Sequence, residues 1–103
     1  MSQGKKKVRE QFRKAVFGRD KKKCCFCEKT ENLDAHHITD RNEMPNGGYV
    51  KENGISVCEE HHRMAEEYHS TGTALPGFHP DDLYKVIGSS KEEAYRASLR
   101  LKV

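Results

Sequence analysis

The strongest constraint on this chain is a pair of short motifs, Cys24-x-x-Cys27 and Cys58-x-x-His61, with 30 residues between them. Each motif offers two ligands on one side of a tetrahedron, and the spacing is typical of two zinc knuckles that share a structural Zn²⁺. A DNA-reading C₂H₂ finger is poorly supported, because its ligand pairs are only about 12 residues apart. Cys25 lies too close to Cys27 to form a knuckle, so we interpret it as a thiol that does not bind metal. Disulfides or free thiols are the alternative, which this spacing disfavours.

A metal staple is expected because apolar residues are scarce. Of the 103 residues, 34% are hydrophobic and 34% are charged, and there is no tryptophan. A single small domain of this composition supplies a thin core. No apolar run approaches the roughly 18 residues of a membrane span, and no apolar stretch follows the basic N-terminus as it would in a signal peptide. We therefore expect one domain in a reducing cytoplasm, without a membrane partner.

Positive charge is concentrated in residues 1–23, which carry ten basic and two acidic side chains. This segment has a net charge of +8, and because the whole chain is +3, the remainder is −5. So steep an asymmetry indicates a polyanionic partner such as DNA, contacted mostly through its phosphates. A solvated, poorly ordered arm is the alternative.

Apolar spacing and turn signals divide the chain into short elements of an α+β fold. Val8, Phe12, Ala15 and Val16 share one helical face, which predicts a helix with its basic face outward that ends at Gly18. Two β-prone runs are separated by turn-rich sequence, and three further segments carry helix-start signals. The predicted elements are helix 5–17, strand 33–38, strand 55–58, helix 59–70, helix 80–87 and helix 90–101. We group them as a basic arm (1–23), a zinc-bound core (24–70) and two C-terminal helices that cover the core (71–103).

Two pairs of adjacent histidines flank the predicted hairpin. His36 and His37 end the first strand, and His61 and His62 open the helix that follows the second. Successive residues of a helix are 100° apart, so His61 can face the zinc ligands while His62 points elsewhere. Glu66 and His69 follow His62 at i+4 and i+7, so the three side chains form one stripe of the helix. The chain can therefore build a second metal site beside the first.

Together these features resemble the HNH endonucleases, the ββα-metal nucleases. That family has a His or Asp before a catalytic His, and an Asn five residues before a Cys at the second strand. It also has Cys-x-x-Cys-His at the helix start, often with a Cys-x-x-Cys upstream. The matching residues are His36, His37, Asn53, Cys58, His61, His62, Cys24 and Cys27. His61 stands where the family usually has a second Cys, and the resemblance covers about residues 24–66.

The resemblance implies a small zinc-stabilised ββα-metal fold that hydrolyses phosphodiester bonds in DNA, leaving 5′-phosphate and 3′-hydroxyl ends. We assign His37 as general base, with Asn53 fixing its ring or its loop. His36 and His62 would hold one divalent ion, with Glu66 as a further direct or water-mediated ligand. Because imidazole ligands also suit later transition metals, we expect Mg²⁺ or Mn²⁺ to support activity and Ni²⁺ or Co²⁺ to substitute.

Two residues outside the motifs are weaker candidates. Asp34, two positions before His36, could orient a histidine through its carboxylate, and a solvent-facing strand residue is the alternative. Arg41, in the loop 39–53, is a candidate phosphate contact.

Three functions are compatible with the sequence. The first is a DNA endonuclease, which as a monomer would nick, and no dimerisation signature is visible. The second is a zinc-stabilised nucleic-acid-binding module that no longer cleaves, and the third is a protein-interaction module whose basic arm docks an acidic partner. Retention of both His37 and Asn53 favours the enzyme.

Small stand-alone proteins of this type are often carried by phages, so the resemblance also implies phage packaging proteins as partners and the host cytoplasm as location.

Overall fold

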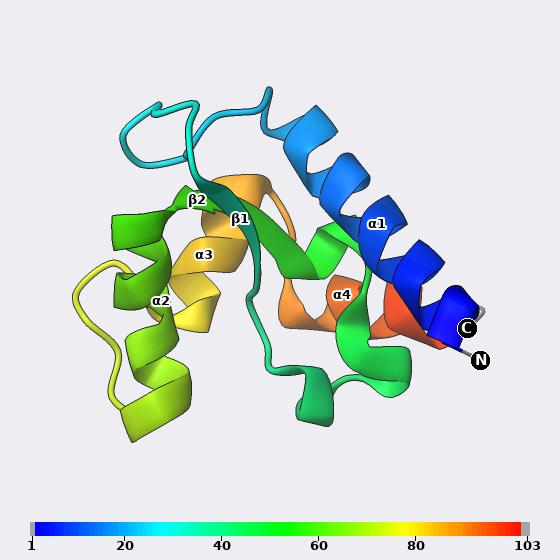
Figure 1. Cartoon of the computed structure of the whole chain (residues 1–103). Coiled ribbons are helices and arrows are strands. Elements are labelled where there is room, and N and C mark those ends of the chain that lie inside the picture. The colour runs from blue at the N-terminus through cyan, green and yellow to red at the C-terminus, as the bar shows by residue number, and fades with distance from the viewer. Residues whose placement is uncertain (1, 102–103) are drawn as a thin grey trace.

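A two-stranded antiparallel sheet separates the two longest helices of the chain (Figure 1). The computed structural model describes the backbone of residues 2–101 and the side chains of residues 6–101. The helices and strands, in chain order, are α1 (Ser2–Arg19), β1 (Leu33–His37), β2 (Gly54–Cys58), α2 (Glu59–Thr71), α3 (Pro80–Ile87) and α4 (Lys91–Leu99). Three short 3₁₀ turns lie between the strands, η1 (Arg41–Glu43), η2 (Pro45–Gly48) and η3 (Lys51–Asn53).

The predicted α+β composition is confirmed, and all six predicted elements form within two to three residues of the expected bounds. Two helix ends differ from the prediction. Gly18 does not end α1 but lies in its last turn, and the chain leaves the helix at Lys21 and Lys22, whose φ angles of 59° and 56° are left-handed. The last helix stops at Leu99 instead of Leu101.

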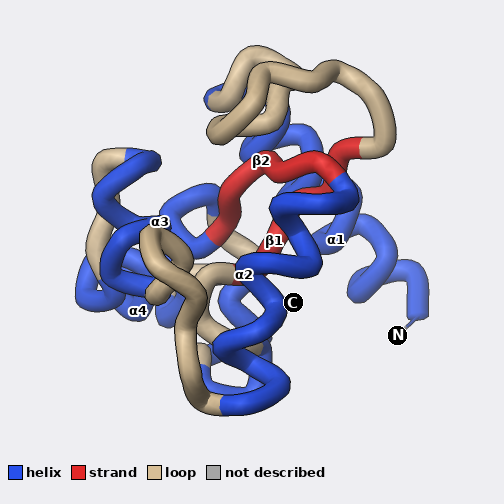
Figure 2. Tube along the Cα trace, turned by 90° about the vertical axis from the view of Figure 1, so that its left-hand side faces the viewer, coloured by secondary structure: helices blue, strands red, loops and turns tan. Residues whose placement is uncertain are grey.

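The register of the hairpin fixes which way each histidine of β1 points. His36 pairs with Ile55 and His37 pairs with Gly54. Because side chains alternate along a strand, His36 and His37 face opposite sides of the sheet. Figures 1 and 2 show α1 on one of these sides and α2 on the other. The neighbouring histidines therefore meet different helices.

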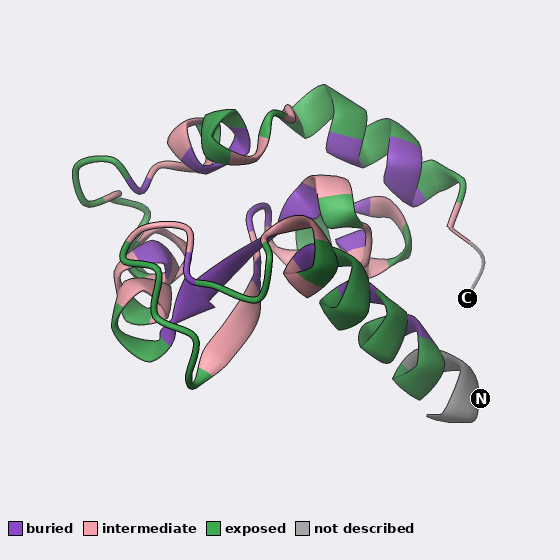
Figure 3. Ribbon diagram, turned by 90° about the horizontal axis from the view of Figure 1, so that it is seen from above, coloured by how far each residue is buried: buried purple, intermediate pink, exposed green. Residues whose placement is uncertain are grey.

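The apolar core lies mainly on the α2 side of the sheet. Its largest fully buried side chains are Ile38, which follows β1, Ile55 of β2 and Leu83 of α3, and α4 closes it with small residues that allow close packing. In Figure 3, β2 is buried along its length while the outward surface of α1 is exposed. The buried hydrophobic residues there include Ile38, Ile55, Val57, Ala65, Leu83, Tyr84 and Ala94. As predicted, α3 and α4 cover the core.

On the other side, α1 packs through a narrow apolar stripe. Val8, Phe12 and Val16 are buried, whereas Ala15, which was predicted to share their face, is exposed. The stripe approaches β2 closely at Gly54, where a Cβ atom would lie 2.5 Å from Val16 Cγ2 and 2.7 Å from the Phe12 ring. A residue without a side chain is therefore required where α1 crosses the sheet.

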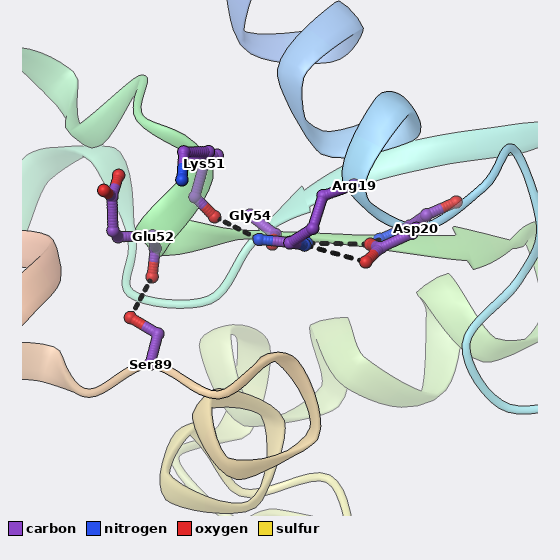
Figure 4. Close-up of polar contacts among 7 residues, drawn as sticks. Arg19, Asp20, Lys51, Glu52, Gly54 and Ser89 are labelled. Atoms are coloured by element: carbon purple, nitrogen blue, oxygen red, sulfur yellow. Dashed lines mark hydrogen bonds and ion pairs between the residues drawn. The ribbon is translucent and has the colours of Figure 1, made fainter.

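Side chains at the end of α1 satisfy the free edge of β2 (Figure 4). The Asp20 carboxylate accepts a hydrogen bond from the Ser56 backbone N–H at 2.9 Å. Arg19 pairs with Asp20 and donates to the backbone carbonyl oxygens of Lys51 and Gly54, each at 2.6 Å. Buried backbone groups need hydrogen-bond partners. These side chains supply the hydrogen bonds to the edge of β2 that a third strand would otherwise supply. They also explain why the helix continues past Gly18.

We expect Gly54→Ala to destabilise the protein by about 1–3 kcal/mol, because the added methyl group forces α1 away from the sheet. Gly18→Ala is the matched control, since a Cβ there meets nothing within 4 Å. That substitution should stabilise the helix by about 0.5–1 kcal/mol. Urea denaturation followed by circular dichroism measures both. Equal stability of the two variants would contradict the close approach at Gly54.

Candidate metal centres

The four ligands predicted for the structural metal converge. One ligand atom from each of Cys24, Cys27, Cys58 and His61 lies within 4.8 Å of the others. Cys58 Sγ is 3.1 Å from His61 Nδ1 and 3.7 Å from Cys27 Sγ, and Cys24 Sγ is 3.6 Å from His61 Nδ1. Tetrahedral zinc with bonds of about 2.3 Å to sulfur separates two sulfur atoms by about 3.8 Å. This Cys₃His cluster could hold a metal such as zinc.

Backbone hydrogen bonds shape the first knuckle. The N–H of Cys24 donates to the Lys29 carbonyl at 2.8 Å, and the N–H of Glu28 donates back to the Cys24 carbonyl at 3.0 Å. The N–H of Phe26 points at Cys24 Sγ, 3.4 Å away. Burial acts to raise the pKa of Cys24, but hydrogen bonds from the backbone N–H groups of Phe26, Cys58 and Cys27 and from the Cys27 thiol outweigh it, and the pKa is lowered. A lowered pKa favours the thiolate, which is the form that binds metal.

Two phenylalanines hold the ring of His61. Phe26 stacks on it with ring centroids 5.3 Å apart, and Phe78 lies parallel at 6.0 Å. The two phenyl rings also contact each other at 4.8 Å. Neither residue was predicted from the sequence, because Phe26 and Phe78 both lie in loops, where there is no periodic signal. They orient Nδ1 towards the sulfur atoms.

Cys25 stands outside the cluster, as predicted. Its backbone N–H donates to the Ser56 carbonyl at 3.0 Å, which turns its side chain away from the other thiols. Burial, with the nearby Asp20 carboxylate adding to it, raises the pKa of Cys25 to about 12. The thiol is therefore protonated at neutral pH.

A second cluster contains His36 from β1 with His62 and Glu66 from α2, and its ligand atoms also lie within 4.8 Å of one another. Glu66 Oε1 is 3.2 Å from His62 Nε2 and 3.3 Å from His36 Nδ1. Contact with the His36 ring outweighs burial and lowers the pKa of Glu66 to about 2, so the carboxylate is ionised. As predicted, His61 and His62 diverge towards different clusters.

His36 is the most telling member of this second cluster. The residue is only 1% exposed, and neither ring nitrogen makes a hydrogen bond with acceptable geometry. The 3.3 Å contact between His36 Nδ1 and Glu66 Oε1 is within ion-pair distance but does not qualify as a hydrogen bond. Burial lowers the pKa of His36 and keeps the ring neutral. Buried polar atoms without partners are rare, and a neutral imidazole beside a carboxylate is a suitable metal ligand set.

Asp34 takes a role in the same cluster. Its Oδ2 lies 3.3 Å from Nδ1 of His62. A carboxylate at one ring nitrogen fixes the ring and its tautomer and leaves the other nitrogen free to bind metal. The histidine that Asp34 orients is therefore His62 and not its neighbour His36.

His37 faces the opposite side of the sheet and does not share a pocket with His36 and His62. Its ring stacks on Phe12 at 4.5 Å and meets the edge of Tyr49 at 4.8 Å. It lines an open groove of about 350 Å³ together with Arg9, Phe12, Arg13, Ala35, Arg41 and Tyr49. Burial, helped by the charge of Arg41, lowers the pKa of His37 to about 4, so the ring is neutral at pH 7. Nε2 is buried without a partner, which leaves Nδ1 as the more accessible ring nitrogen in the groove.

Asn53 fixes the loop and does not contact the His37 ring. Its Oδ1 accepts hydrogen bonds from the Thr39 N–H at 3.0 Å and the Tyr84 hydroxyl at 2.7 Å. Its Nδ2 donates to the carbonyl oxygens of Thr39 and Gly48. Of the two roles predicted for Asn53, the geometry supports the one that holds the chain following β1.

His69 continues the stripe of His62 and Glu66 along α2, as predicted, although no role could be assigned to it from the sequence. Its Nε2 lies 3.1 Å from the backbone carbonyl oxygen of His37, at the edge of β1 that has no partner strand in the described residues. Its ring also lies 5.3 Å from that of His36.

No protein-family model matches this chain, and no curated protein or solved structure matches it. Within residues 2–101, none of the helices combines the length and apolar character that a bilayer crossing requires.

We expect Cys58→Ala to lose its metal and its cooperative fold. Metal binding at such clusters contributes free energy on the order of 10 kcal/mol, comparable with the whole stability of a small domain. Cys25→Ala is the matched control and should keep both properties. Metal content by mass spectrometry and thermal melts by circular dichroism are the measurements. A stable, metal-free Cys58→Ala protein would refute the structural role.

Proposed function

We propose that this protein is a metal-dependent DNA endonuclease or nickase of the HNH type. The observation that best supports the proposal is the ring of His36, buried without hydrogen-bond partners beside His62 and Glu66. Such a ring is costly in a fold stabilised only by packing. It is reasonable if a divalent ion occupies the cluster.

In this proposal the Cys₃His cluster holds a structural zinc ion and the second cluster holds the reactive ion. A divalent ion on His36, His62 and Glu66 would supply positive charge for the scissile phosphate and the leaving 3′ oxygen. Asp34 would hold His62 in its ligating tautomer. The zinc cluster would fix the first turn of α2, from which His62 projects.

His37 would take the proton of the attacking water through Nδ1. A general base must be neutral before it acts, and the low pKa of His37 meets that requirement. Phe12 and Tyr49 hold its ring, and His69 holds its backbone carbonyl. His36 and His37 are consecutive residues of β1, so the proposed metal cluster and the proposed base lie on opposite faces of the same strand.

DNA is the proposed substrate because the groove beside His37 is cationic. Arg9, Arg13 and Arg41 line it, and none of them pairs with a carboxylate among the described residues. Their positive charge is available to phosphates, and most of α1 outside its buried stripe is exposed.

A zinc-stabilised nucleic-acid-binding module without cleavage is the second candidate. The observation that favours it is the separation of His37 from the metal cluster by the thickness of the sheet. Such a module would use the same cationic groove but would not need a base.

We expect His37→Ala to remain folded and to bind DNA while its cleavage rate falls about 10²–10⁴-fold, the usual contribution of a general base. His79→Asn is the matched control, since His79 belongs to neither cluster and caps α3, where Asn is also a good N-cap. Supercoiled plasmid with Mg²⁺ or Mn²⁺, scored for nicked and linear product, gives the answer. Absence of cleavage by the native chain with every metal tested would leave the binding module as the function.

Mg²⁺ or Mn²⁺ should support cleavage, because the Glu66 carboxylate and water are ligands that suit them, and Ni²⁺ or Co²⁺ should substitute, because the two imidazoles suit later transition metals. The same plasmid assay with each chloride salt in turn measures this preference in zinc-loaded protein. Activity with Ca²⁺ alone would show that the ligands are oxygen atoms and that the second cluster is not the reactive site.

A further inference from the structure

The groove beside His37 continues into a second hollow between α1 and the 3₁₀ turns. This hollow measures about 370 Å³ and is lined by Val8, Arg9, Arg41, Asn42, Asn46, Gly47 and Tyr49. It shares Arg9, Arg41 and Tyr49 with the hollow at His37. A chain-like ligand lying in one hollow can therefore continue directly into the other.

The hydroxyl group of Tyr49 is a free donor in this second hollow. Arg41 Nη1 donates a hydrogen bond to the Tyr49 oxygen at 3.0 Å, so the phenolic proton is not used in that contact. Burial acts to raise the pKa of Tyr49, but the guanidinium groups of Arg41 and Arg9 outweigh it and the pKa is lowered. The phenol therefore lies in a field that attracts an anion.

The two guanidinium groups also lack a negative partner. Among the described residues, Arg19 and Arg96 are paired with neighbouring carboxylates, whereas Arg9 and Arg41 are paired with none. Two guanidinium groups without a carboxylate at ion-pair distance, beside a hydroxyl donor, form a suitable site for a phosphate group.

The loop beneath the hollow is built to hold the Tyr49 ring. Gly47 has a φ of 80°, and a Cβ atom there would lie 2.7 Å from Tyr49 Cε2, so only glycine fits against the ring. The Asn46 amide group is committed to the carbonyl oxygens of Ser98 and Leu101. The floor is therefore fixed to α4 and its C-terminal end, and the donors left for a ligand are mainly those of Arg9, Arg41 and Tyr49.

We propose that Arg9, Arg41 and the Tyr49 hydroxyl form a subsite for the phosphodiester group next to the one at His37, on the same DNA strand. The inference deepens the proposed function and rests on it for the identity of the polyanion. The subsite grips the backbone and reads no base edge. It sets the register of the strand across the groove, and it predicts tolerance of sequence at the flanking nucleotide.

The test measures DNA binding under conditions without cleavage. Its result can therefore be interpreted even if the protein proves not to be a nuclease. Fluorescence anisotropy follows a labelled single-stranded dodecamer and the matching duplex with zinc-loaded protein and no added Mg²⁺ or Mn²⁺. Arg9→Gln should weaken binding about tenfold and reduce the slope of log affinity against log salt by about 0.7–0.9, as expected for one phosphate contact. Tyr49→Phe, which keeps the ring that packs on Phe12 and His37, should weaken binding several-fold.

Lys7→Gln is the matched control for charge. Lys7 is exposed on α1 and lies about 160° around the helix from Arg9, away from the groove. It should weaken binding about twofold or less. Equal losses for Lys7→Gln and Arg9→Gln, or no loss for Tyr49→Phe, would overturn the subsite in favour of diffuse attraction. A second measurement tests whether inorganic phosphate protects Arg41 from a reagent that modifies guanidinium groups. Protection without competition against the dodecamer would show that the site binds a small phosphate ion, and it would overturn the strand assignment.

Discussion

The first turn of α2 is the constraint on which both metal clusters depend. His61 and His62 are consecutive, and one helical step of 100° directs His61 to three thiols and His62 to a buried imidazole. Any change in where α2 begins would rotate both rings at once. The Cys₃His cluster therefore does more than compensate for a thin core, because it fixes the orientation of a side chain that it does not contain. Phe26 and Phe78 reinforce that orientation by holding the His61 ring.

The α1 side of the sheet is organised by a different interaction. There is no metal cluster among the described residues of that side, and the helix is held instead by the close approach at Gly54 and by the polar contacts of Arg19 and Asp20 with the edge of β2. These contacts bring Phe12 against the His37 ring. The basic helix, which from charge alone could be a loose arm, is thus an integral wall of the groove. Its cations have defined positions relative to His37.

Local patterns in the sequence predicted the elements and the two clusters, because ligand spacing and helical periodicity are encoded within a few residues. The convergence of Cys24, Cys27, Cys58 and His61 followed from two short motifs and one hairpin. The environment of His37 could not be predicted in the same way. Phe12, Tyr49 and His69 reach it from three separate elements, and nothing local to any of them specifies the contact. The partner of Asp34 was likewise undetermined, because cross-strand alternation and the rotation of α2 together decide which imidazole it meets.

Under the proposed function, placing a metal cluster and a neutral base on opposite faces of one strand would have a physical advantage. A base within the metal cluster would itself bind the ion, as His36 and His62 are placed to do, and would then be unable to accept a proton. The alternation of β1 keeps His37 out of reach of the ion while leaving it only one residue away from His36. Burial against Phe12 and Tyr49 keeps the ring neutral, and the guanidinium groups nearby add to that effect while attracting the anion on which the base would act. The same cations can therefore serve both purposes, which explains why they are left without carboxylate partners in a chain that has 16 acidic residues.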